Sequence, residues 1–571
     1  MSDTHQSESR HDSAQLTFDL TSRPWIPVLK SNGRQEELSL REVFAQASHI
    51  RRLVGDLPTQ EFALVRLLLA VAHDALDGPE DIDDWTDLWA DETCFEPVQA
   101  YLDAHAHRFD LLHATAPFFQ TAALRTAKDE VASLNRIVAD VPNGEPFFTA
   151  RMPTVERLTY AEAARWVVHA HAYDTSGIKT GVEGDSRAKG GKVYPLGVGW
   201  AGNLGGVYVE RPTLRETLLL NLVAADTSNF EVDEDDAPAW RREPCGPGGA
   251  ERAPTGVRDL YTWQTRRLRL HYDEHGVHGV VLGYGDPLTP RNRQHREPMT
   301  GWRRSTAQEK KLKQIPVYLP RDHDPARAAW RGVEALVTNR PAPSQGSEPP
   351  AFLRPAVLEW VARLATGGHL ERGFLVRARV IGATYGTQQS VIDEIVDDAV
   401  SLDIVLLHRQ DRRYAEQAIA AVDDADRVVM AVGDLATNLA QAAGTETEGP
   451  RATARDQTYG LLEAPYRAWL RDMTAADDPF EQRAVWQRRL HEIAVDVGDR
   501  LMAAAGDAAW QGRTVQLKKG PEWLNSALAG KWYRSALTKA LGRPDATEPD
   551  PAHTTPDILQ PDSETTVKAP A

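Results

Sequence analysis

The sequence predicts an α+β protein, with a large mixed N-terminal domain of short strands and long loops followed by a C-terminal four-helix bundle. Up to residue 400, capped helical runs mix with short alternating apolar stretches and with long segments rich in glycine and proline. After residue 410, apolar residues recur at three-four spacing in long segments joined by short breaks. At about 150 residues per domain, 571 residues suffice for three or four folding units or for two large ones.

The first helices are predicted from capping boxes. Residues 39–42, 159–162 and 213–216 each pair a serine or threonine with a glutamate three residues later, and each opens an apolar run. A further run, residues 62–72, is apolar apart from Arg66. This run is shorter than the roughly 18 residues that a membrane span needs, so it predicts a buried helix.

Two segments of the N-terminal part alternate as strands do. Residues 266–284 predict a hairpin, because two alternating apolar runs flank a short glycine-containing turn. Residues 374–381 predict a strand that places Arg377 and Arg379 on one face.

The last part of the chain predicts four amphipathic helices. Glycine, proline and aspartate mark the breaks between them, and such short connections are typical of an antiparallel bundle. We expect the helices at residues 411–443, 453–473, 479–505 and 522–541. The predicted domains are residues 1–15 as a disordered N-terminus, 16–402 as the mixed α+β domain, 403–542 as the four-helix bundle and 543–571 as a disordered tail.

Charge and cysteine content narrow the class of function. The formal net charge is -17, which excludes a protein that coats nucleic acid by its bulk charge, although a local basic patch remains compatible with it. The two cysteines, Cys94 and Cys245, cannot form a disulfide framework or a four-cysteine zinc site. Residues 1–15 are polar and do not resemble a signal peptide, so we expect reduced thiols and a cytoplasmic protein.

A search for catalytic motifs favours a binding or assembly protein. The glycines of residues 197–202 satisfy GxGxxG, but an extended segment follows where a dinucleotide site needs a helix. The histidine pairs 105/107 and 169/171 are spaced i, i+2, and such residues do not face one another on a helix to clamp a metal. We therefore expect no catalytic residues, no metal and no cofactor. A hydrolase built around Ser186 or around His323 and Asp324 remains an alternative.

The most basic segment points to nucleic acid. Residues 291–313 hold eight lysines and arginines against two glutamates, a net charge of +6, together with Trp302 and His295. Basic residues interleaved with rings can follow a phosphate backbone and stack on bases. The competing interpretation is a solvated, partly mobile loop.

Two loops add to this signal. Residues 177–206 contain 10 glycines, where average usage predicts about two. Glycine lets a backbone approach a ligand closely, so this segment is either a loop that can enter a minor groove or a flexible connector. Residues 384–390 follow the predicted strand as a tight turn that carries two amides, Gln388 and Gln389.

Several blocks, in this order along the chain, resemble one known family. They are residues 18–20, 23–28, 116–121, 172–179, 199–206, 214–221 and 385–390, with the four C-terminal helices after them. Together they resemble the large subunit of the type I-E CRISPR Cascade complex, the CasA family, over nearly the whole folded chain. No single block is decisive, and the order of the blocks carries the resemblance.

The resemblance implies a non-catalytic subunit of an RNA-guided surveillance complex in antiviral defence. Such a subunit recognises the protospacer-adjacent motif (PAM) of double-stranded DNA from the minor groove and wedges the duplex open for guide RNA pairing and R-loop formation. It then docks the helicase–nuclease. The implied partners are the small subunits, the backbone and 5′-handle subunits, the guide crRNA, target DNA and the helicase–nuclease, with no membrane. The bundle would contact the small subunits and help to hold displaced DNA, and residues 16–402 become the DNA-recognition domain.

The resemblance also assigns residues. The wedge glutamine falls on Gln389, and Gln388 stands where an asparagine is usual. A basic hairpin residue that touches the motif could be Arg291 or Arg293. The implied DNA-binding residues are Gly177, Ile178, Lys179, Thr180, Gly181, Arg291, Arg293, Thr387, Gln388, Gln389 and Ser390, and Phe147 and Phe148 are the candidates for the crRNA-handle contact. The alternative within this family is a structural scaffold subunit whose loops never touch DNA.

Overall fold

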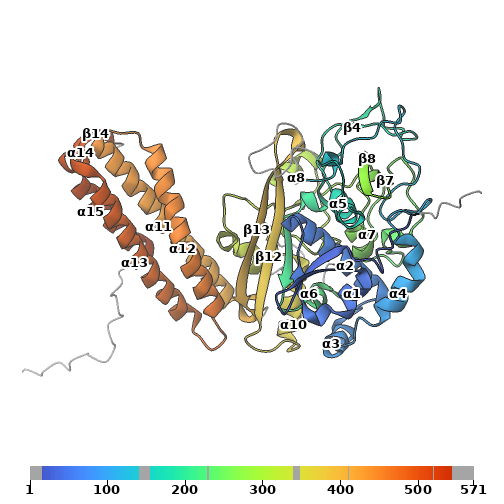
Figure 1. The fold of residues 1–571 in the computed structure, drawn as a ribbon. Coiled ribbons are helices and arrows are strands. Elements are labelled where there is room, and N and C mark those ends of the chain that lie inside the picture. The colour runs from blue at the N-terminus through green and yellow to red at the C-terminus, as the bar shows by residue number, and fades with distance from the viewer. Residues whose placement is uncertain are drawn as a thin grey trace, which may run out of the picture. The chain divides into compact units, whose positions relative to one another are not determined.

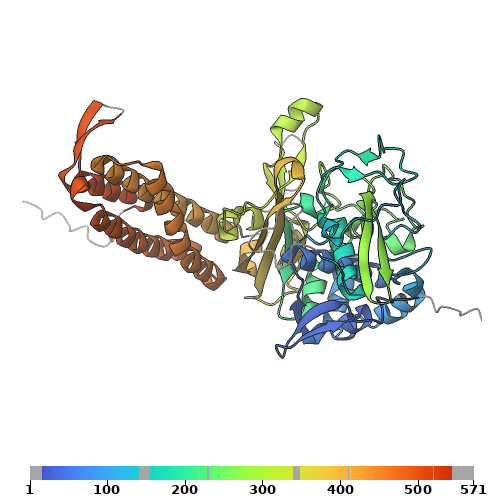
Figure 2. The same ribbon diagram turned by 45° about the horizontal axis from the view of Figure 1, so that its top comes forward.

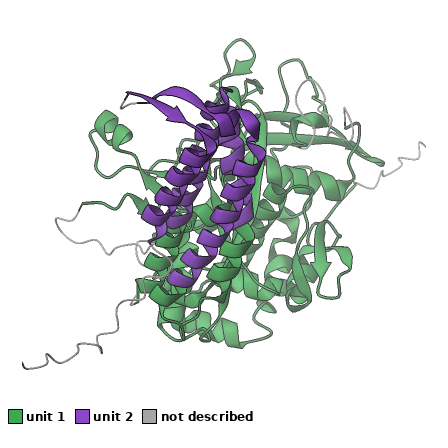
Figure 3. Cartoon of the chain, turned by 90° about the vertical axis from the view of Figure 1, so that its left-hand side faces the viewer, with its two compact units in different colours: residues 1–422, 463–483 green, residues 423–462, 484–571 purple. Residues whose placement is uncertain are grey.

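The computed structural model describes most of the chain (Figure 1). The described residues are 16–139, 155–227, 230–337, 348–408, 411–517 and 520–542. The predicted disorder of residues 1–15 and 543–571 therefore lies outside them. Contacts group the chain into two compact units, coloured in Figure 3: unit 1 comprises residues 1–422 and 463–483, and unit 2 comprises residues 423–462 and 484–571. The domain boundary at residues 402/403 remains a prediction.

Unit 1 begins with a small antiparallel sheet of order β2-β1-β3, formed by β1 (Ile26–Lys30), β2 (Gln35–Leu38) and β3 (Ile50–Leu53). Helix α1 (Leu40–Ala45) follows β2 and starts at the predicted capping box. Ser39 Oγ accepts from the backbone N–H of Glu42, and the Glu42 carboxylate accepts from the backbone N–H of Ser39. The other two predicted helix starts head α5 (Tyr160–Tyr173) and α6 (Leu214–Asn221).

A buried helix runs through the core of unit 1. Residues 59–74 of α2 (Pro58–Ala75) are all buried, which confirms the helix predicted there. The single charge of its apolar run, Arg66, is neutralised by a bidentate pair with Glu297 at 2.9 Å for both bonds. Trp200 Nε1 donates to the same carboxylate at 2.7 Å. The buried arginine is therefore paired and hydrogen-bonded, as burial of a charge requires.

A second antiparallel sheet carries the longest hairpin. Its order is β13-β12-β6, formed by β6 (Gly206–Glu210), β12 (Leu375–Tyr385) and β13 (Ile392–Asp403). The predicted strand is confirmed and extends to Tyr385. Arg379 does not face solvent beside Arg377 as a free cation, because it is buried and paired with Glu61 at 2.7 Å and Asp397 at 2.9 Å.

Smaller hairpins complete unit 1. The hairpin predicted at residues 266–284 is confirmed as β7 (Arg266–Asp273) and β8 (Gly276–Tyr284). Helix α8 (Thr306–Leu312) lies between β9 (Trp302–Arg304) and β10 (Tyr318–Pro320) and projects from the unit in Figure 2, where it is yellow-green. The remaining elements of this unit are α3 (Ile82–Ala90), α4 (Pro97–His105), β4 (Lys179–Thr180), β5 (Lys192–Val193), α7 (Val257–Tyr261), α9 (Glu334–Val337), β11 (Phe352–Leu353) and α10 (Ala356–Thr366). Short 3₁₀ helices connect the elements: η1 (Ala47–His49), η2 (Ala106–Arg108), η3 (Leu134–Arg136), η4 (Ala201–Asn203), η5 (Ala239–Arg241), η6 (Ala329–Gly332), η7 (Thr387–Gln389) and η8 (Ile404–Leu407).

The C-terminal helices occur close to their predicted positions. They are α11 (Arg413–Ala443), α12 (Glu448–Asp472), α13 (Pro479–Ala504) and α15 (Ser526–Leu541). Within unit 2, Tyr459 of α12 donates to Asp426 of α11 at 2.8 Å, and Gln487 of α13 donates to Asp424 of α11 at 2.9 Å. No helix among the described residues has the length and apolar character that crossing a membrane requires.

The helix predicted over residues 522–541 begins too early. Helix α14 (Gly506–Gln511) and a hairpin of β14 (Arg513–Leu517) and β15 (Gly520–Leu524) precede α15. Two local features set this boundary: Gly512 has a φ of +74°, which ends α14, and Asn525 caps α15 by accepting from the N–H of Leu528 at 2.9 Å. Cross-strand pairing thus overrides the helical pattern of residues 522–524.

Candidate nucleic-acid interface

Two of the predicted DNA-binding segments lie against each other. Ser176 N donates to Gln389 O at 2.7 Å, and a Cβ added to Gly177 would lie 4.0 Å from Ser390. The glycine loop, residues 177–181, and the turn at residues 387–390 therefore form one surface, which we call the loop–turn site. They are about 200 residues apart in sequence, so only the tertiary fold brings them together.

The turn displays its two amides outward. Gly386 N donates to Val391 O at 3.1 Å, and Gln389 N donates to Gly386 O at 2.8 Å, which closes the tip of the β12–β13 hairpin. Gln388 and Gln389 have φ values of +57° and +54°, the left-handed region that costs roughly 1–2 kcal/mol for a residue with a Cβ. Both side chains are exposed and make no hydrogen bond within the described part of the chain. The strained backbone therefore presents two unpaired amides at one point.

A tyrosine anchors the base of this turn. Tyr385 Oη donates to Tyr173 O, at the end of α5, at 2.8 Å, and burial raises the pKa of Tyr385 well above its usual value. Gly202 leaves room for this ring, because a Cβ there would lie 2.1 Å from Tyr385 Oη. Gly202 belongs to the GxGxxG string, whose tight packing here is unrelated to a phosphate loop.

The glycine loop is supported from inside by a lysine. Lys179 is buried, and its Nζ lies 2.6 Å from Asp174 Oδ2 and 5.3 Å from the centre of the Tyr284 ring. Burial lowers the Lys179 pKa to about 8, and Asp174 opposes that shift. Burial alone would raise the pKa of Asp174, but Lys179 and Arg266 together hold it below its usual value. The Lys179 ammonium would have to leave Asp174 to contact DNA as predicted.

Ile178 and Thr180 make up the outward face of the glycine loop, whereas Gly177 is half-buried and Gly181 is buried. Tyr284 Oη donates to Gly177 O at 2.8 Å and so fixes the start of the loop against β8. Ile178 is 52% exposed, and Thr180 is exposed as well. Gly181 N donates to Gly191 O at 2.8 Å, so the loop continues as a narrow two-stranded projection.

The basic residues beside the loop divide into two groups. Arg187 is bound internally, since it pairs with Asp185 at 2.8 Å and donates to two backbone carbonyls of the β8 end. Lys189 and Lys192 lie at the exposed end of the projection, followed by Tyr194, which is 63% exposed. These two lysines and the tyrosine are groups that the family resemblance did not assign. Their exposure beside the glycine loop identifies them as candidate phosphate and base contacts.

The basic residues of the segment 291–313 also include some that are half-buried and some that are exposed. Arg291 and Arg293 are half-buried, and Arg293 Nε donates to Thr289 O at 3.4 Å. Within the described ranges, no hydrogen bond joins either arginine to the loop–turn site. Lys310, Lys311 and Lys313 are exposed on α8 and at its end. These three lysines and Arg303 are therefore the exposed charges of the segment.

Two predictions remain without structural support. Phe147 and Phe148, the candidates for the handle contact, lie outside the described residues. For the hydrolase alternative, Ser186 is exposed, whereas His323 donates its Nε2–H to Gly206 O at 2.9 Å. No sequence motif and no hydrogen bond of the described residues pairs these two side chains as a nucleophile and base would be. The described residues also contain no group of three or more His, Cys, Asp or Glu that could hold a metal ion.

Sequence reasoning missed the groups that support the site. Asp174, Ser176, Tyr284 and Tyr385 join the loop to the turn and to the protein beneath it. A single sequence offers no periodicity for such contacts. The one available signal was the position of Asp174 and Ser176 directly after a predicted helix and before the glycine-dense segment.

Comparisons with known proteins give a consistent result. The family model of CRISPR-associated protein Cse1 matches residues 19–497. A Thermus thermophilus protein described as CRISPR-associated protein CasA/Cse1 is 29% identical over 557 residues, covering 92% of this chain and 98% of the relative.

Solved structures agree with the family match. The crystal structure of Thermobifida fusca Cse1 has a TM-score of 0.85 and 54% identity, covering 92% of this chain and 98% of that one. A chain of a structure named "CRISPR RNA-guided surveillance complex" has a TM-score of 0.65 at 16% identity, covering 91% of this chain and 99% of that one, which shows a shared fold.

Proposed function

Because the chain belongs to the CRISPR-associated Cse1 family, whose members are also called CasA, we propose that it is the large subunit of a type I-E RNA-guided surveillance complex. In this role it recognises a short PAM in double-stranded DNA and opens the adjoining duplex. The observation that carries the proposal is the hydrogen bond from Ser176 N to Gln389 O, which places the glycine loop beside the amide-tipped turn. Membership of a surveillance complex is supported by the structure of that name to which the chain is similar.

The glycine loop is suited to reading a minor groove. That groove is only about 6 Å wide and distinguishes A·T from G·C pairs poorly. Gly177 carries no side chain, and the exposed Ile178 and Thr180 can contact the edges of the groove. A reader of this kind tolerates several motif sequences, which leaves the detailed sequence information to guide pairing.

The adjacent turn is suited to opening the duplex. Gln388 and Gln389 present donor and acceptor groups that can replace lost base-pair hydrogen bonds. Separating a base step costs a few kcal/mol, offset by new protein–DNA contacts. The hydrogen bonds from Tyr385 to α5 and from Ser176 to Gln389 hold the turn in place while it separates the bases.

The remaining parts of the proposal concern partners. We place the small subunits and the displaced strand at the C-terminal four-helix bundle, and the backbone and 5′-handle subunits with guide crRNA at the N-terminal domain. The helicase–nuclease that follows R-loop formation docks on this subunit. The protein itself carries out no catalysis and acts in the cytoplasm, where the guide-loaded complex meets invading DNA.

Substituting the wedge residue tests the proposal. In the reconstituted complex, Gln389→Ala should slow duplex opening by about 10-fold or more, since each 1.4 kcal/mol lost is a factor of ten. Initial binding to the duplex should change by less than about 3-fold. Base-analogue fluorescence beside the PAM reports opening, and gel-shift titration reports binding.

Gln35→Ala is the matched control, because Gln35 is an exposed glutamine in unit 1 away from the loop–turn site. An opening rate for Gln389→Ala equal to that of this control would contradict the wedge role.

A crosslinking experiment separates this proposal from a scaffold subunit that never touches DNA. A photoreactive phenylalanine at Ile178, which is 52% exposed, should crosslink to duplex DNA in the assembled complex. The yield should fall when the PAM is replaced, because only a bound motif holds the loop in the groove. The same residue placed at Val131, 45% exposed on another part of unit 1, serves as the control. Equal yields at the two positions would favour the scaffold.

A further inference from the structure

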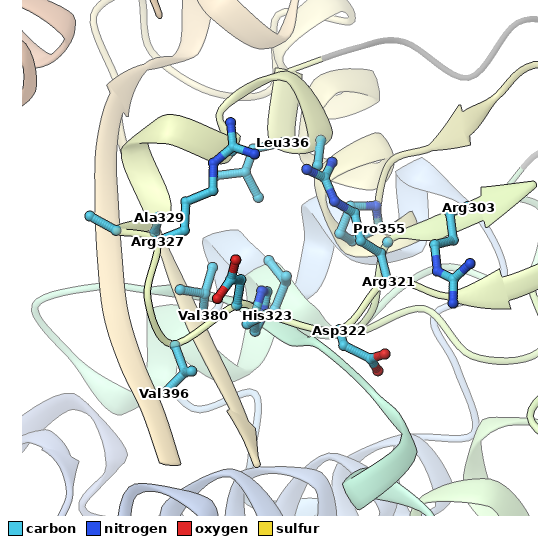
Figure 4. Close-up of a pocket in the computed structure, with 16 residues that line it drawn as sticks. Arg303, Arg321, Asp322, His323, Arg327, Ala329, Leu336, Pro355, Val380 and Val396 are labelled. Carbon is cyan, nitrogen blue, oxygen red and sulfur yellow. The ribbon is translucent and has the colours of Figure 1, made fainter. Parts of the chain in front are cut away.

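A separate cavity lies in unit 1, away from the loop–turn site. Its volume is about 320 Å³, which falls in the lower range of small-molecule pockets. It is bounded by β6, β9, β12 and β13, by the segment that follows β10, and by η6 and α9 (Figure 4). None of residues 177–181 or 387–390 lines it. Three arginines and two aspartates supply its charges: Arg303, Arg321, Arg327, Asp322 and Asp324.

Arg321 has an unsatisfied donor at this cavity. Its backbone N–H donates to Gly301 O at 2.8 Å, which fixes the main chain at the cavity wall. Its guanidinium lies 5.2 Å from the centre of the Phe352 ring. Nη1 is buried and has no hydrogen-bond partner among the described residues. A buried guanidinium nitrogen without an acceptor is unfavourable, and arginine does not escape this by losing its proton.

A second guanidinium approaches the same region. Arg327 Nη2 donates to Arg331 O at 2.5 Å, and its other N–H groups make no bond within the described ranges. In Figure 4 the side chains of Arg321 and Arg327 extend toward the same side of the cavity. Burial lowers the pKa of Arg321; the carboxylate of Glu334, an exposed residue of α9 that does not line the cavity, opposes that shift, and the like charge of Arg327 adds to it.

The two aspartates of the cavity do not neutralise this pair. Asp324 Oδ1 accepts from Ala326 N at 3.0 Å and so caps its own turn. Asp322 faces Arg303, on another side of the cavity in Figure 4; burial raises the Asp322 pKa, and Arg303 opposes that shift. His323 is held by its bond to Gly206 O, and burial lowers its pKa, so it is neutral near pH 7. Arg321 and Arg327 therefore form the cationic side of the cavity.

We propose that this cavity binds a small ligand bearing a phosphate group, with its oxygens held by Arg321 and Arg327. Guanidinium groups bind phosphate oxygens through paired N–H donors, and two such groups match the several oxygens of a phosphate better than the two of a carboxylate. The buried Nη1 of Arg321 supplies a donor that no group in the described part of the chain engages. The remaining volume can take a ligand body such as a nucleoside.

Calorimetric titration of the full chain at constant ionic strength tests this site. The probes are inorganic phosphate, AMP and adenosine. Phosphate and AMP should bind and adenosine should not. Equal affinity for phosphate and AMP identifies a free phosphate as the ligand, whereas tighter AMP binding identifies a nucleotide, and either result supports the oxyanion site. Binding of adenosine as tight as that of AMP would overturn it.

Substitutions of the two arginines test whether phosphate binds in this cavity. Arg321→Met should weaken phosphate binding by about 10- to 100-fold, the expected loss of a charge-assisted contact. Without probe it should lower the thermal midpoint only slightly, because Nη1 has no hydrogen-bond partner among the described residues and the methionine side chain can keep the packing against the Phe352 ring. Arg51→Gln, an exposed arginine of β3, should bind as the unaltered protein does.

Arg327→Gln provides an independent test should Arg321→Met fail to fold, since Arg327 is exposed. It should also weaken binding by about 10-fold. Affinity unchanged in Arg327→Gln, or no binding of phosphate or AMP up to about 10 mM, would overturn the proposal.

Discussion

At the scale of single residues, the glycines of the 197–202 string show how one pattern can have two physical causes. A GxGxxG string suits a phosphate loop, but here it serves close packing. A Cβ on Gly199 would lie 2.3 Å from the Ala172 carbonyl carbon, and one on Gly202 would lie 2.1 Å from Tyr385 Oη. Both glycines therefore let the chain approach α5 and the base of the turn.

Gly202→Ala tests this interpretation. The added methyl group must displace Tyr385 and break its bond to Tyr173 O, so the free energy of unfolding should fall by about 1–3 kcal/mol. Urea titration of the full chain measures the loss. Gly246→Ala is the control, because no atom of the described residues lies within 4 Å of a Cβ at that position, and it should change stability by less than about 0.5 kcal/mol. Equal midpoints for the two variants would show that the contact has no energetic role.

At the scale of elements, α5 connects the core to the loop–turn site. Two of its histidines, His169 and His171, are buried, and burial lowers the pKa of each to about 4. His171 Nε2 donates to Phe119 O at 2.8 Å, and His169 Nε2 lies 3.0 Å from Thr59 Oγ1. The neutral rings thus pack the helix whose end supplies the acceptor for Tyr385.

This burial predicts a pH dependence. The ordinary histidine pKa is 6.5, so between pH 6.5 and 4 the unfolded chain binds more protons than the folded one. The free energy of unfolding therefore has its full value above pH 6.5. It decreases as the pH falls toward 4, by up to about 3 kcal/mol for each histidine. Unfolding titrations across this range should show a shallower pH slope for His171→Gln than for the unaltered protein.

His275→Gln is the matched control for the pH series, since its side chain is 73% exposed. A slope for His171→Gln as steep as that of this control would mean that His171 does not titrate on unfolding.

The elements also show where sequence patterns succeed and fail. An apolar run predicted the buried α2, and apolar periodicity predicted the long C-terminal helices, because apolar surface must pack whatever its partner is. It missed the β14–β15 hairpin, whose pairing from Arg513 to Leu524 depends on the partner strand. The same limit applies to Arg379, whose burial depends on Glu61, 318 residues away.

At the scale of the whole molecule, net charge and local charge oppose each other. The chain carries a net charge of -17, so the proposed attraction to DNA must come from a few exposed cations. Lys310 and Lys311 on α8 and Lys189 and Lys192 beside the glycine loop are such cations. Partner subunits can supply further phosphate contacts, as the proposed assembly requires.

The salt dependence of DNA binding tests whether these exposed lysines contact phosphates. Replacing Lys310 and Lys311 with glutamine should reduce the slope of log K against log salt by about 1 to 2, since each phosphate contact contributes about 0.9. Gel-shift titrations of the assembled complex at several salt concentrations measure this slope. Lys128→Gln, an exposed lysine 3.9 Å from Glu130, should leave it unchanged. A slope that does not move in the double variant would place the phosphate contacts elsewhere.

The sequence by itself determined the α+β class, the main helices, the absence of bulk basic charge and the family, because composition, periodicity and the order of local blocks are written along the chain. Only the tertiary structure decided that the glycine loop touches the turn and that the Lys179 ammonium pairs with Asp174. It also decided that Arg321 lines a cavity and that its Nη1 makes no hydrogen bond with the described residues. The contact of the loop with the turn and the packing of Lys179 against Tyr284 join groups far apart in sequence, and a side chain's role is set by the neighbours that folding brings to it.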